Sequence, residues 1–361
     1  MRVIISAGGT GGHIYPALAI INKIKQMDPT SEFLYIGTTD RMEATIIPER
    51  NINYVGIEMK GLNRKNVFKN VSVISSFIKG IKKCKKVMKE FKPDIVLGVG
   101  GYISAPVIYA AQSLKIKTFI HEQNSIPGLS NKFLARYVDK VGVSLPSSIK
   151  YFDKKKVIYT GNPRSEEAYN ASPALKSNYK LSSNKKLVLI VMGSLGSMVI
   201  SQKMKEVLPK FKNKNYEVLF VTGKNYYEEY NNIKNIPTNV KIAPYIEDML
   251  GIMKRTDLII SRAGATVISE ITALGIPSIL IPSPYVTHNH QYMNAKELSD
   301  RGAASIIEES KLSSDILIEK IDEIMENKKK YDIMKKESKK IGVKDSASKI
   351  YNVIKQLVDG V

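Results

Sequence analysis

The amino-acid sequence predicts an α/β protein built from two tandem, doubly wound parallel-sheet domains. Short β-branched runs alternate with longer helical stretches along the chain. Within a run, apolar residues do not alternate with polar ones, which indicates strands buried on both faces by helices. The same alternation begins again near Lys186, and 361 residues suit two domains of roughly 150–200 residues each. Both domains are therefore expected to be Rossmann-like.

The expected elements follow from these runs. In the first half we expect strands at Arg2–Ser6, Phe33–Gly37, Asn53–Gly56, Ile95–Gly98, Thr118–His121, Lys140–Val143 and Val157–Thr160, and a first helix at Tyr15–Gln26. In the second half we expect strands within 186–194, 216–223, 240–245, 257–264 and 278–284, and a helix from Val199.

Domain limits follow from composition. The segment 160–186 is rich in Ser, Asn and Pro and fits an interdomain connection. This gives an N-terminal domain at 1–162 and a C-terminal domain at 163–340. The tail from Ser310 is helical in pattern, and we expect its last part, 341–361, to dock on the first domain.

The net charge of +21 makes nucleic acid, anionic lipid and acidic metabolites the candidate partners. Eleven Lys or Arg and one acid, Glu90, lie between Lys60 and Lys92. Val71, Ile74, Phe77, Ile78 and Ile81 recur among them at helical spacing. An apolar stripe flanked by lysines is typical of a helix lying on anionic lipid, although an amphipathic helix packed on its own sheet has the same pattern.

Other classes of protein have less support. The chain has no Trp and no aromatic run typical of RNA binding. The single cysteine, Cys84, excludes an intrachain disulfide and lacks the partner that a catalytic thiol needs. The N-terminal apolar run is too short for a secretory signal, and no apolar run reaches the roughly 18 residues of a spanning helix.

Three glycine-bearing turns, at 7–13, 192–197 and 261–270, each connect a predicted strand to a helix. Backbone N–H groups at a helix start can bind an anion, although glycine is also required there for steric reasons alone. Ile14 occupies the last glycine position of a dinucleotide fingerprint, and no Walker loop occurs. Glu270 lies four residues after Thr266, so a diphosphate at this turn would leave Glu270 one turn further on, where a carboxylate can bind ribose hydroxyls.

Two histidine-containing segments are the other candidates. His13 lies where the first glycine turn leads into a helix, and imidazole suits a general base near neutral pH; a helix cap is the structural alternative. His288, Asn289, His290 and Gln291 follow a predicted strand and could bind sugar hydroxyls. Because no Cys, His or carboxylate set supports them at metal spacing, we expect no metal site.

Six motifs occur in order along the whole chain: SAGGTGGHIYPALAI, GVGGYISAPV, HEQNSIPGLSNK, TGNPR, SRAGATVISEITALGIPSILIP and NHQYMNA. With them, the sequence strongly resembles the bacterial UDP-N-acetylglucosamine–undecaprenyl-pyrophosphoryl-muramoyl-pentapeptide N-acetylglucosaminyltransferases, which make lipid II from lipid I in peptidoglycan synthesis. The resemblance implies a GT-B fold, with two domains facing a cleft, and an inverting GlcNAc transfer that needs no metal or other cofactor. Residues 192–196 read MGSLG, where the family usually has GGSQG.

The resemblance also implies roles for individual residues. His13 and Asn124 would be catalytic. The acceptor diphosphate would meet Gly9, Gly12, Gly100, Gly101 and Tyr102. The donor, UDP-GlcNAc, would bind through Thr10, Gly11, Gly12, Asn124, Arg164, Ser194, Ile246, Ala265, Thr266, Glu270, His290 and Gln291. Glu270 would bind the ribose, Ala265 and Thr266 the diphosphate, Arg164 and Ile246 would face the uracil, and Gln291 and His290 would meet the GlcNAc hydroxyls.

The implied partners are UDP-GlcNAc, lipid I, an anionic membrane surface and proteins of cell-wall synthesis, with no nucleic acid. The protein would be peripheral, on the cytoplasmic face of the cell membrane, with Ile74, Phe77, Ile78, Lys79 and Lys82 facing the lipid. Two related activities stay open. A UDP-GlcNAc 2-epimerase has a similar scaffold but needs acidic residues for elimination, and a diacylglycerol glycosyltransferase differs only in its acceptor.

Overall fold

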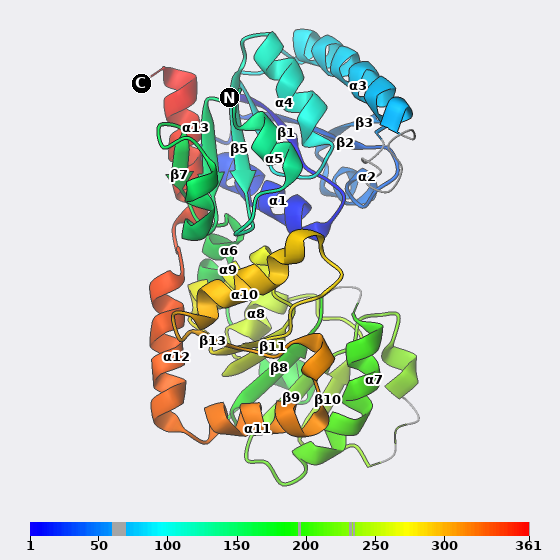
Figure 1. Cartoon of the computed structure of the whole chain (residues 1–361), viewed down its shortest axis with the longest axis vertical. Helices are drawn as coiled ribbons and strands as arrows, with labels where there is room; N and C mark the ends of the chain where they lie inside the picture. The colour runs from blue at the N-terminus through cyan, green and yellow to red at the C-terminus, as the bar shows by residue number, and fades with distance from the viewer. Residues whose placement is uncertain (60–69, 194–195, 231–232, 234, 361) are drawn as a thin grey trace. The chain divides into compact units, whose positions relative to one another are not determined.

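A computed structural model describes residues 1–59, 70–193, 196–230, 233 and 235–360. The chain divides into two compact units (Figure 1). The first comprises Met1–Arg164 together with Asp345–Val361, and the second comprises Ser165–Lys344. Each unit contains one all-parallel sheet.

The sheet of the first unit has seven strands in the order β3-β2-β1-β4-β5-β6-β7. They are β1 (Arg2–Ser6), β2 (Glu32–Thr38), β3 (Asn53–Ile57), β4 (Ile95–Gly98), β5 (Lys117–Glu122), β6 (Lys140–Val143) and β7 (Val157–Tyr159). The helices of this unit are α1 (Gly11–Met27), α2 (Glu43–Ile46), α3 (Asn70–Phe91), α4 (Ser104–Ser113), α5 (Leu129–Leu134) and α13 (Ser346–Asp359).

Both faces of this sheet are covered. Val3 and Ile5 of β1 point to one face, where they share a core with α1 and α13. Ile4 points to the other face and packs with residues of α3, α4 and α5. The C-terminal helix contributes Ile350, Val353 and Ile354 to the first core, so this last segment of the chain belongs to the first unit.

The sheet of the second unit has six strands in the order β10-β9-β8-β11-β12-β13. They are β8 (Leu187–Val191), β9 (Glu217–Val221), β10 (Val240–Ala243), β11 (Leu258–Ser261), β12 (Ser278–Leu280) and β13 (Ala304–Ile306). The helices are α6 (Arg164–Asn170), which begins at the boundary between the units, α7 (Met198–Val207), α8 (Met249–Met253), α9 (Ala265–Leu274), α10 (His290–Ser299), α11 (Ser314–Met325) and α12 (Lys328–Ile341).

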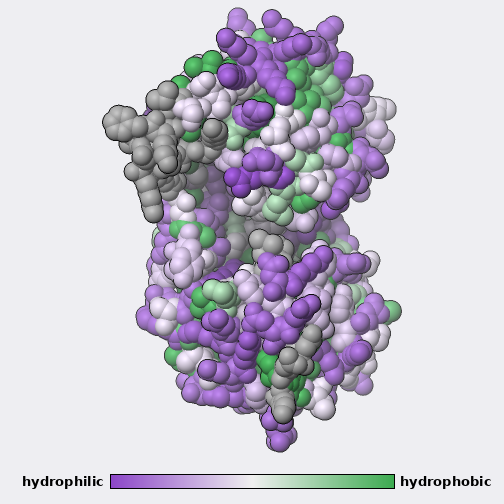
Figure 2. Space-filling model, turned by 90° about the vertical axis from the view of Figure 1, so that its right-hand side faces the viewer, coloured by the Kyte–Doolittle hydropathy of each residue, from purple (hydrophilic) through white to green (hydrophobic). Residues whose placement is uncertain are grey.

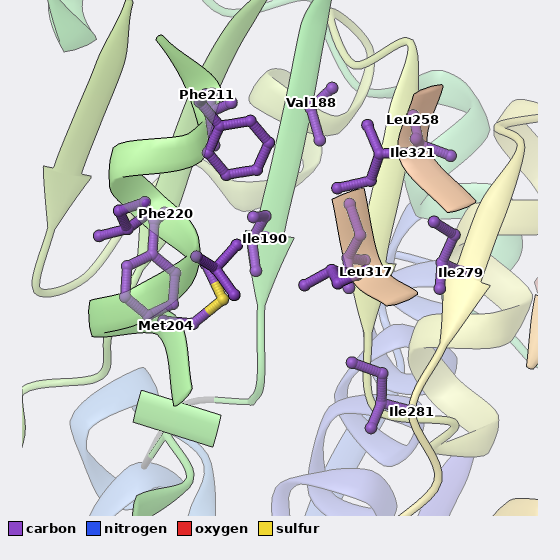
Figure 3. Close-up of a cluster of buried hydrophobic side chains, with 14 of the residues drawn as sticks. Val188, Ile190, Met204, Phe211, Phe220, Leu258, Ile279, Ile281, Leu317 and Ile321 are labelled. Carbon is purple, nitrogen blue, oxygen red and sulfur yellow. The ribbon is translucent and has the colours of Figure 1, made fainter. Parts of the chain in front are cut away.

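The second sheet is also buried on both faces. On one face, Ile190 of β8 packs with Met204 of α7 and Leu317 of α11 (Figure 3). On the other face, Leu189 packs with Ile268 of α9 and Leu298 of α10. Every residue of β8 and β9 is buried, which confirms that the non-alternating apolar runs form central parallel strands.

The predicted elements differ from the structure in three places. All seven strands expected in the first half occur with ends within one residue, but the first helix begins at Gly11 rather than Tyr15. Glycine is a poor helix former, yet the first turn makes few intrahelical bonds and tolerates it. The segment 160–186 contains α6 and a 3₁₀ turn at Lys176–Tyr179, so most of it belongs to the second unit. The three-residue edge strand β13 was not expected.

In both sheets the strand order reverses at the centre, between β1 and β4 and between β8 and β11. At such a switch point the loops after the two central strands diverge, which leaves room for a ligand at their carboxyl ends. The loops after β1 and β4 contain 7–10 and 99–103, and those after β8 and β11 contain 192–197 and 262–264. All three glycine-bearing turns are therefore at switch points.

A buried histidine ties β5 to the end of the first sheet. His121 is fully buried, and its Nε2–H donates to the carbonyl oxygen of Gly161 at 2.9 Å. The Nδ1 atom lies 3.1 Å from Nε2 of Gln123, which donates to it. Burial lowers the pKa of His121 from 6.5 to about 4. The folded protein therefore holds this imidazole neutral.

We expect acid to destabilise the protein through His121. Above pH 6.5 the imidazole is neutral in both states, and its contribution to stability is complete. As the pH falls from 6.5 to 4, the unfolded chain binds the proton first, so the free energy of unfolding decreases by about 3 kcal/mol. Urea unfolding between pH 7 and pH 4 should show this decrease in the wild type and a shallower one in His121→Gln. Equal pH dependence in both proteins would contradict the assignment.

Candidate active site

The first glycine turn is a tight connection between β1 and α1. Gly9 has a φ of +86°, a conformation that favours glycine. Thr10 is the N-cap of α1 but makes no side-chain capping bond. Thr10 and Gly12 are exposed, while Gly11 is half-buried. The first turn of α1 therefore presents backbone at the surface, beside the positive end of the helix dipole.

His13 is in the first turn of α1, half-buried, and its ring is oriented by the loop. Nδ1 lies 3.0 Å from the carbonyl oxygen of Gly8 and 3.4 Å from Oγ1 of Thr10. A carbonyl oxygen can only accept, so in this contact Nδ1 carries the proton. In the neutral ring, Nε2 then has the lone pair. This is the tautomer that a general base acting through Nε2 requires.

The second motif of this unit, GVGGY, packs directly against the first turn. A Cβ atom on Gly100 would lie 2.5 Å from Cδ2 of His13, and one on Gly101 would lie 2.5 Å from the carbonyl oxygen of Gly8. Both glycines have positive φ, +108° and +85°. The structure thus brings Gly100 and Gly101 together with His13, and glycine is required at both positions by the close approach.

A buried carboxylate beneath the first turn was not predicted from the sequence. Glu43, the first residue of α2, has no exposed surface. Its Oε2 accepts from the backbone N–H of Gly9 at 3.0 Å, and its Oε1 accepts from Oγ1 of Thr38 at 2.8 Å. The Gly9 amide therefore points toward Glu43. We expect Gly9 to permit close approach of a ligand, while the helix start at Gly11 and Gly12 supplies N–H groups.

A second buried carboxylate supports Asn124. Oε1 of Glu122, at the end of β5, accepts from the backbone N–H of Asn124 at 2.9 Å and from its Nδ2 at 3.3 Å. Oε2 accepts from the backbone N–H of Gly128 and from Nδ2 of Asn131. Glu122 is 2% exposed. It therefore holds the loop after β5 in one shape and fixes the position of Asn124.

In the second unit, the turn after β11 leads into α9 through Gly264, the helix N-cap. Gly264 has no side chain to cap this helix, and a Cβ atom on Gly264 would come within 4 Å only of Val267, at 3.9 Å, among the described residues. Ala265 and Thr266 form the first turn. Glu270 lies one turn further on and is only 7% exposed. The helix start that follows the predicted glycine turn and the carboxylate one turn behind it are thus both on α9.

An ion pair holds this turn in place. Arg262 pairs with the buried Glu309, and its Nη2 also donates to Oγ of Ser197 at 2.8 Å. Nη1 donates to the carbonyl oxygen of Ile281 at 3.2 Å. Arg262 thereby joins the loop after β11 to the N-cap of α7 and to the end of β12. On the other side, Nδ2 of the buried Asn294 donates to the carbonyl oxygen of Ala263 at 3.2 Å.

The polar run 288–291 forms the start of α10. Nδ1 of His290 lies 2.8 Å from the carbonyl oxygen of Thr287, so it donates, and the neutral ring has its lone pair on Nε2. Oε1 of Gln291 accepts from the backbone N–H of Ser283 at 2.9 Å. This bond fixes the orientation of the amide, with Oε1 as the acceptor. His288 and Asn289 have positive φ, 54° and 50°.

The chain matches two models of one glycosyltransferase family. The N-terminal domain of glycosyltransferase family 28 matches residues 3–143, and the C-terminal domain matches residues 187–350. The chain is also 47% identical over 362 residues to a UDP-N-acetylglucosamine–N-acetylmuramyl-(pentapeptide) pyrophosphoryl-undecaprenol N-acetylglucosamine transferase of Bacillus cytotoxicus. That alignment covers 99% of this chain and 100% of the relative.

The chain belongs to this transferase family. It is therefore a glycosyltransferase, and the resemblance seen in its motifs is confirmed. A relative of the same name from Bacillus pumilus is also 47% identical, over 99% of both chains.

The solved structures agree with the fold expected of the transferase family. The crystal structure of Acinetobacter baumannii MurG matches with a TM-score of 0.79 and 26% identity, covering 98% of this chain and 99% of that one. A UDP-GlcNAc 2-epimerase from Neisseria meningitidis bound to UDP-GlcNAc matches with a TM-score of 0.70 and 16% identity over 99% and 100% of the chains. The epimerase likeness shows a common fold alone.

The remaining predicted residues of this transferase are placed as follows. The side chain of Ile246 is 2% exposed and packs in the core behind β8, so only its backbone is offered as a contact. The Arg164 guanidinium lies over the ring of Tyr15, 5.8 Å from its centroid. Ser194 lies outside the described residues. Cys84 is buried, which raises its pKa to about 12, in agreement with its exclusion as a nucleophile.

Proposed function

We propose that the protein transfers GlcNAc from UDP-GlcNAc to the C4 hydroxyl of MurNAc in undecaprenyl-pyrophosphoryl-MurNAc-pentapeptide, converting lipid I to lipid II, with inversion and without a metal ion. The observation that carries this proposal is the full-length identity of 47% to a transferase whose name states this donor and this acceptor. The oriented imidazole of His13 supplies the base that such a transfer needs.

In the proposed reaction, Nε2 of His13 takes the proton of the acceptor hydroxyl. The hydroxyl oxygen bonds to the anomeric carbon of GlcNAc as the bond from that carbon to the UDP oxygen breaks, and UDP leaves with the electron pair. One displacement of this kind inverts the anomeric centre. The carbonyl oxygen of Gly8, which accepts from Nδ1–H, would stabilise the imidazolium that forms. Asn124, held by Glu122, would position the substrates beside it.

The departing UDP needs a compensating positive charge. The start of α9 supports this role, because Gly264 leaves space for an anion and the first-turn amides at Ala265 and Thr266 add to the positive end of the helix dipole. Among the described residues, no three His, Cys, Asp or Glu side chains gather as a metal site would require. We propose that helix α9 provides the stabilisation that a metal gives in other transferases.

We also assign the ribose, the uracil and the GlcNAc of the donor to individual residues. Glu270 would accept from the ribose hydroxyls, and the backbone of Ile246 together with Arg164 would face the uracil. The NH₂ group of Gln291 and Nε2 of His290 would meet the GlcNAc hydroxyls, since the other ends of both side chains bond to the protein.

The acceptor diphosphate is proposed to meet the start of α1 and the GVGGY motif. Gly12 would let the diphosphate approach the backbone, while Gly100 and Gly101 let the GVGGY turn pack against His13 and Gly8. Arg41, which was not predicted from the sequence, adds a cation there, because its guanidinium is always charged and is hydrogen-bonded to Tyr102. Tyr102 would therefore act together with Arg41 in binding the diphosphate.

The first unit has a surface that suits a lipid acceptor. Ile74 and Ile78 of α3 are 59% and 49% exposed, and Lys79 and Lys82 are exposed beside them. Phe77 is half-buried, so part of the predicted stripe packs inward. Figure 2 shows hydrophobic patches between strongly hydrophilic ones on the first unit, viewed from the side on which α3 lies in Figure 1.

Aromatic rings extend this surface beyond α3. The ring of Phe77 lies 6.4 Å from that of Tyr109 on α4, and Tyr109 lies 6.1 Å from Tyr137. Tyr137 in turn lies 5.4 Å from Phe133 of α5. Tyr109, Tyr137 and Phe133 are all more than a third exposed. Aromatic rings beside lysines are suited to the interface of an anionic membrane. None of the helices described is long and apolar enough to cross a bilayer.

We expect Ile74→Ser/Ile78→Ser to weaken binding to phosphatidylglycerol vesicles by about tenfold or more, because two apolar side chains no longer enter the interface. Vesicle cosedimentation measures the effect. Ile333→Ser is the matched control, because Ile333 on α12 is 48% exposed but belongs to the second unit. Equal vesicle binding by all three proteins would contradict the membrane assignment.

The experiment that tests the function is transfer of labelled GlcNAc from UDP-GlcNAc to a lipid I analogue, with a diacylglycerol as the competing acceptor. We expect label only on the muramyl acceptor, and transfer to the diacylglycerol alone would replace the proposed acceptor. Incubation with UDP-GlcNAc and no acceptor tests the epimerase, and accumulation of UDP-ManNAc would overturn the proposal. Activity in excess EDTA tests metal independence.

A further inference from the structure

A pocket of about 410 Å³ lies at the end of the second sheet opposite to the turn at 262–264. Thr256 and Pro277, which precede β11 and β12, line it, as do the carboxyl ends of α8 and α9. The proposed donor residues of α9 are at its other end, in its first two turns. The pocket is therefore separate from the candidate active site.

Every charged side chain in the lining is a lysine. Lys254 follows α8, Lys335 and Lys339 belong to α12, and Lys344 follows α12; no acidic side chain is among the described residues that line the pocket. Nζ of Lys254 donates to the carbonyl oxygen of Tyr169 at 2.7 Å. Within the part of the chain that the structure describes, Lys335, Lys339 and Lys344 form no ion pair with a carboxylate.

Two tyrosine rings contact three of the four ammonium groups at the pocket. Nζ of Lys344 lies 4.9 Å from the ring centroid of Tyr169, and Nζ of Lys254 lies 5.9 Å from the same centroid. Nζ of Lys335 lies 5.6 Å from the centroid of Tyr331. Cation–π contacts of this kind orient a lysine without neutralising its charge. The pocket therefore keeps a positive potential and has aromatic walls.

Helix ends account for only part of this arrangement. The carboxyl ends of α8 and α9 have partial negative charge, which favours nearby lysines. However, the last turn of α9 is already bonded, because the carbonyl oxygens of Thr272 and Ile271 accept from the backbone N–H groups of Gly275 and Ile276. Capping does not require four lysines from three segments around one cavity.

We propose that this pocket binds a soluble, multiply charged phosphate compound. Its volume falls in the range of small-ligand pockets, roughly 300–1,000 Å³. Several cations without counter-charges repel one another, and a ligand with two or more phosphate charges would relieve this repulsion. Tyr169 and Tyr331 could contact a flat group on the ligand.

The pocket is lined by residues from both segments that connect the two units. Tyr169 belongs to α6, just after the chain passes from the first unit to the second, and Lys344 is the last residue before it returns. A ligand in the pocket would touch both connecting segments. Binding should therefore involve Tyr169 of the first segment and Lys344 of the second.

The test is isothermal titration of the full-length protein with inorganic tripolyphosphate in the absence of nucleotide. Any binding at the proposed donor site would be common to the wild type and both double variants, because none of the substituted lysines is among the donor residues. We expect saturable binding that Lys335→Gln/Lys339→Gln weakens by about tenfold or more. Lys329→Gln/Lys336→Gln is the matched control, because it removes the same charge from exposed positions of α12 outside the pocket. The control should bind tripolyphosphate like the wild type.

Three results would overturn the proposal. No saturable binding of tripolyphosphate would remove the site, and equal weakening in both double variants would show only attraction to net charge. Binding confined to phosphatidylglycerol vesicles, lost with Lys335→Gln/Lys339→Gln while tripolyphosphate does not bind, would assign the lysines to lipid headgroups instead. Because the substituted lysines lie outside the candidate active site, failure here is distinguishable from failure of the transferase assignment.

Discussion

His13→Ala is expected to lower kcat by about 10²–10⁴-fold, the usual contribution of a general base. The variant should still bind UDP, because the proposed role of His13 is toward the acceptor hydroxyl and not toward the nucleotide. In the wild type, Nδ1–H is bonded to Gly8, and Nε2 is the atom proposed to act on that hydroxyl. Transfer of labelled GlcNAc to a lipid I analogue measures turnover, and titration with UDP measures binding.

The same assay separates His13 from its alternative. If a bound water positioned by Asn124 takes the proton, then Asn124→Ala should lose most of the turnover and His13→Ala should keep it. A Gly100→Ala variant adds a second test. Its methyl group would collide with the His13 ring, and an alanine at this position cannot adopt the φ of +108° without strain. It should impair turnover while UDP binding persists. Unchanged turnover in His13→Ala would remove His13 from catalysis.

The fold was largely predictable because it rests on local hydrophobic patterning. The apolar run at Leu187–Val191 has every residue buried, and a run of that kind predicts a central parallel strand without any tertiary information. The start of α1 was missed because two glycines argue against helix, and only the surrounding loops show why they are needed there. The edge strand β13 was missed because three residues, two of them half-buried, have little apolar signal.

The candidate site was predictable only where the sequence itself has an unusual pattern. Glycine-rich turns and the histidine next to them stand out, as does Glu270 behind such a turn. Glu43 does not stand out in the sequence. It bonds to Gly9, 34 residues away, and its sequence neighbours give no sign that it is buried. Arg262 and Glu309, 47 residues apart, are hidden in the same way. Positioning partners of this kind depend on strand order, which no local pattern encodes.

Glu270→Ala is expected to weaken UDP-GlcNAc binding by about 1.5–3 kcal/mol, or roughly 10- to 150-fold in Kd, if its carboxylate accepts from the ribose hydroxyls. The carboxylate is 7% exposed, so water replaces such bonds poorly. Glu270→Gln keeps an acceptor oxygen of similar size without the charge and should lose less. Calorimetric titration of UDP measures each variant, with Glu319→Ala as the control because Glu319 is an exposed glutamate of the same unit.

A cycle with 2′-deoxy-UDP decides whether the loss comes from the ribose. If Glu270 binds the 2′-hydroxyl, removing that hydroxyl and removing the carboxylate delete the same interaction, so the two losses should not add. The Glu270→Ala variant should then discriminate less between UDP and 2′-deoxy-UDP than the wild type does. Fully additive losses would mean that Glu270 acts on the donor site through the packing of α9, since Ile268 and Ile271 of this helix are core residues. In that case the ribose must be bound by another group.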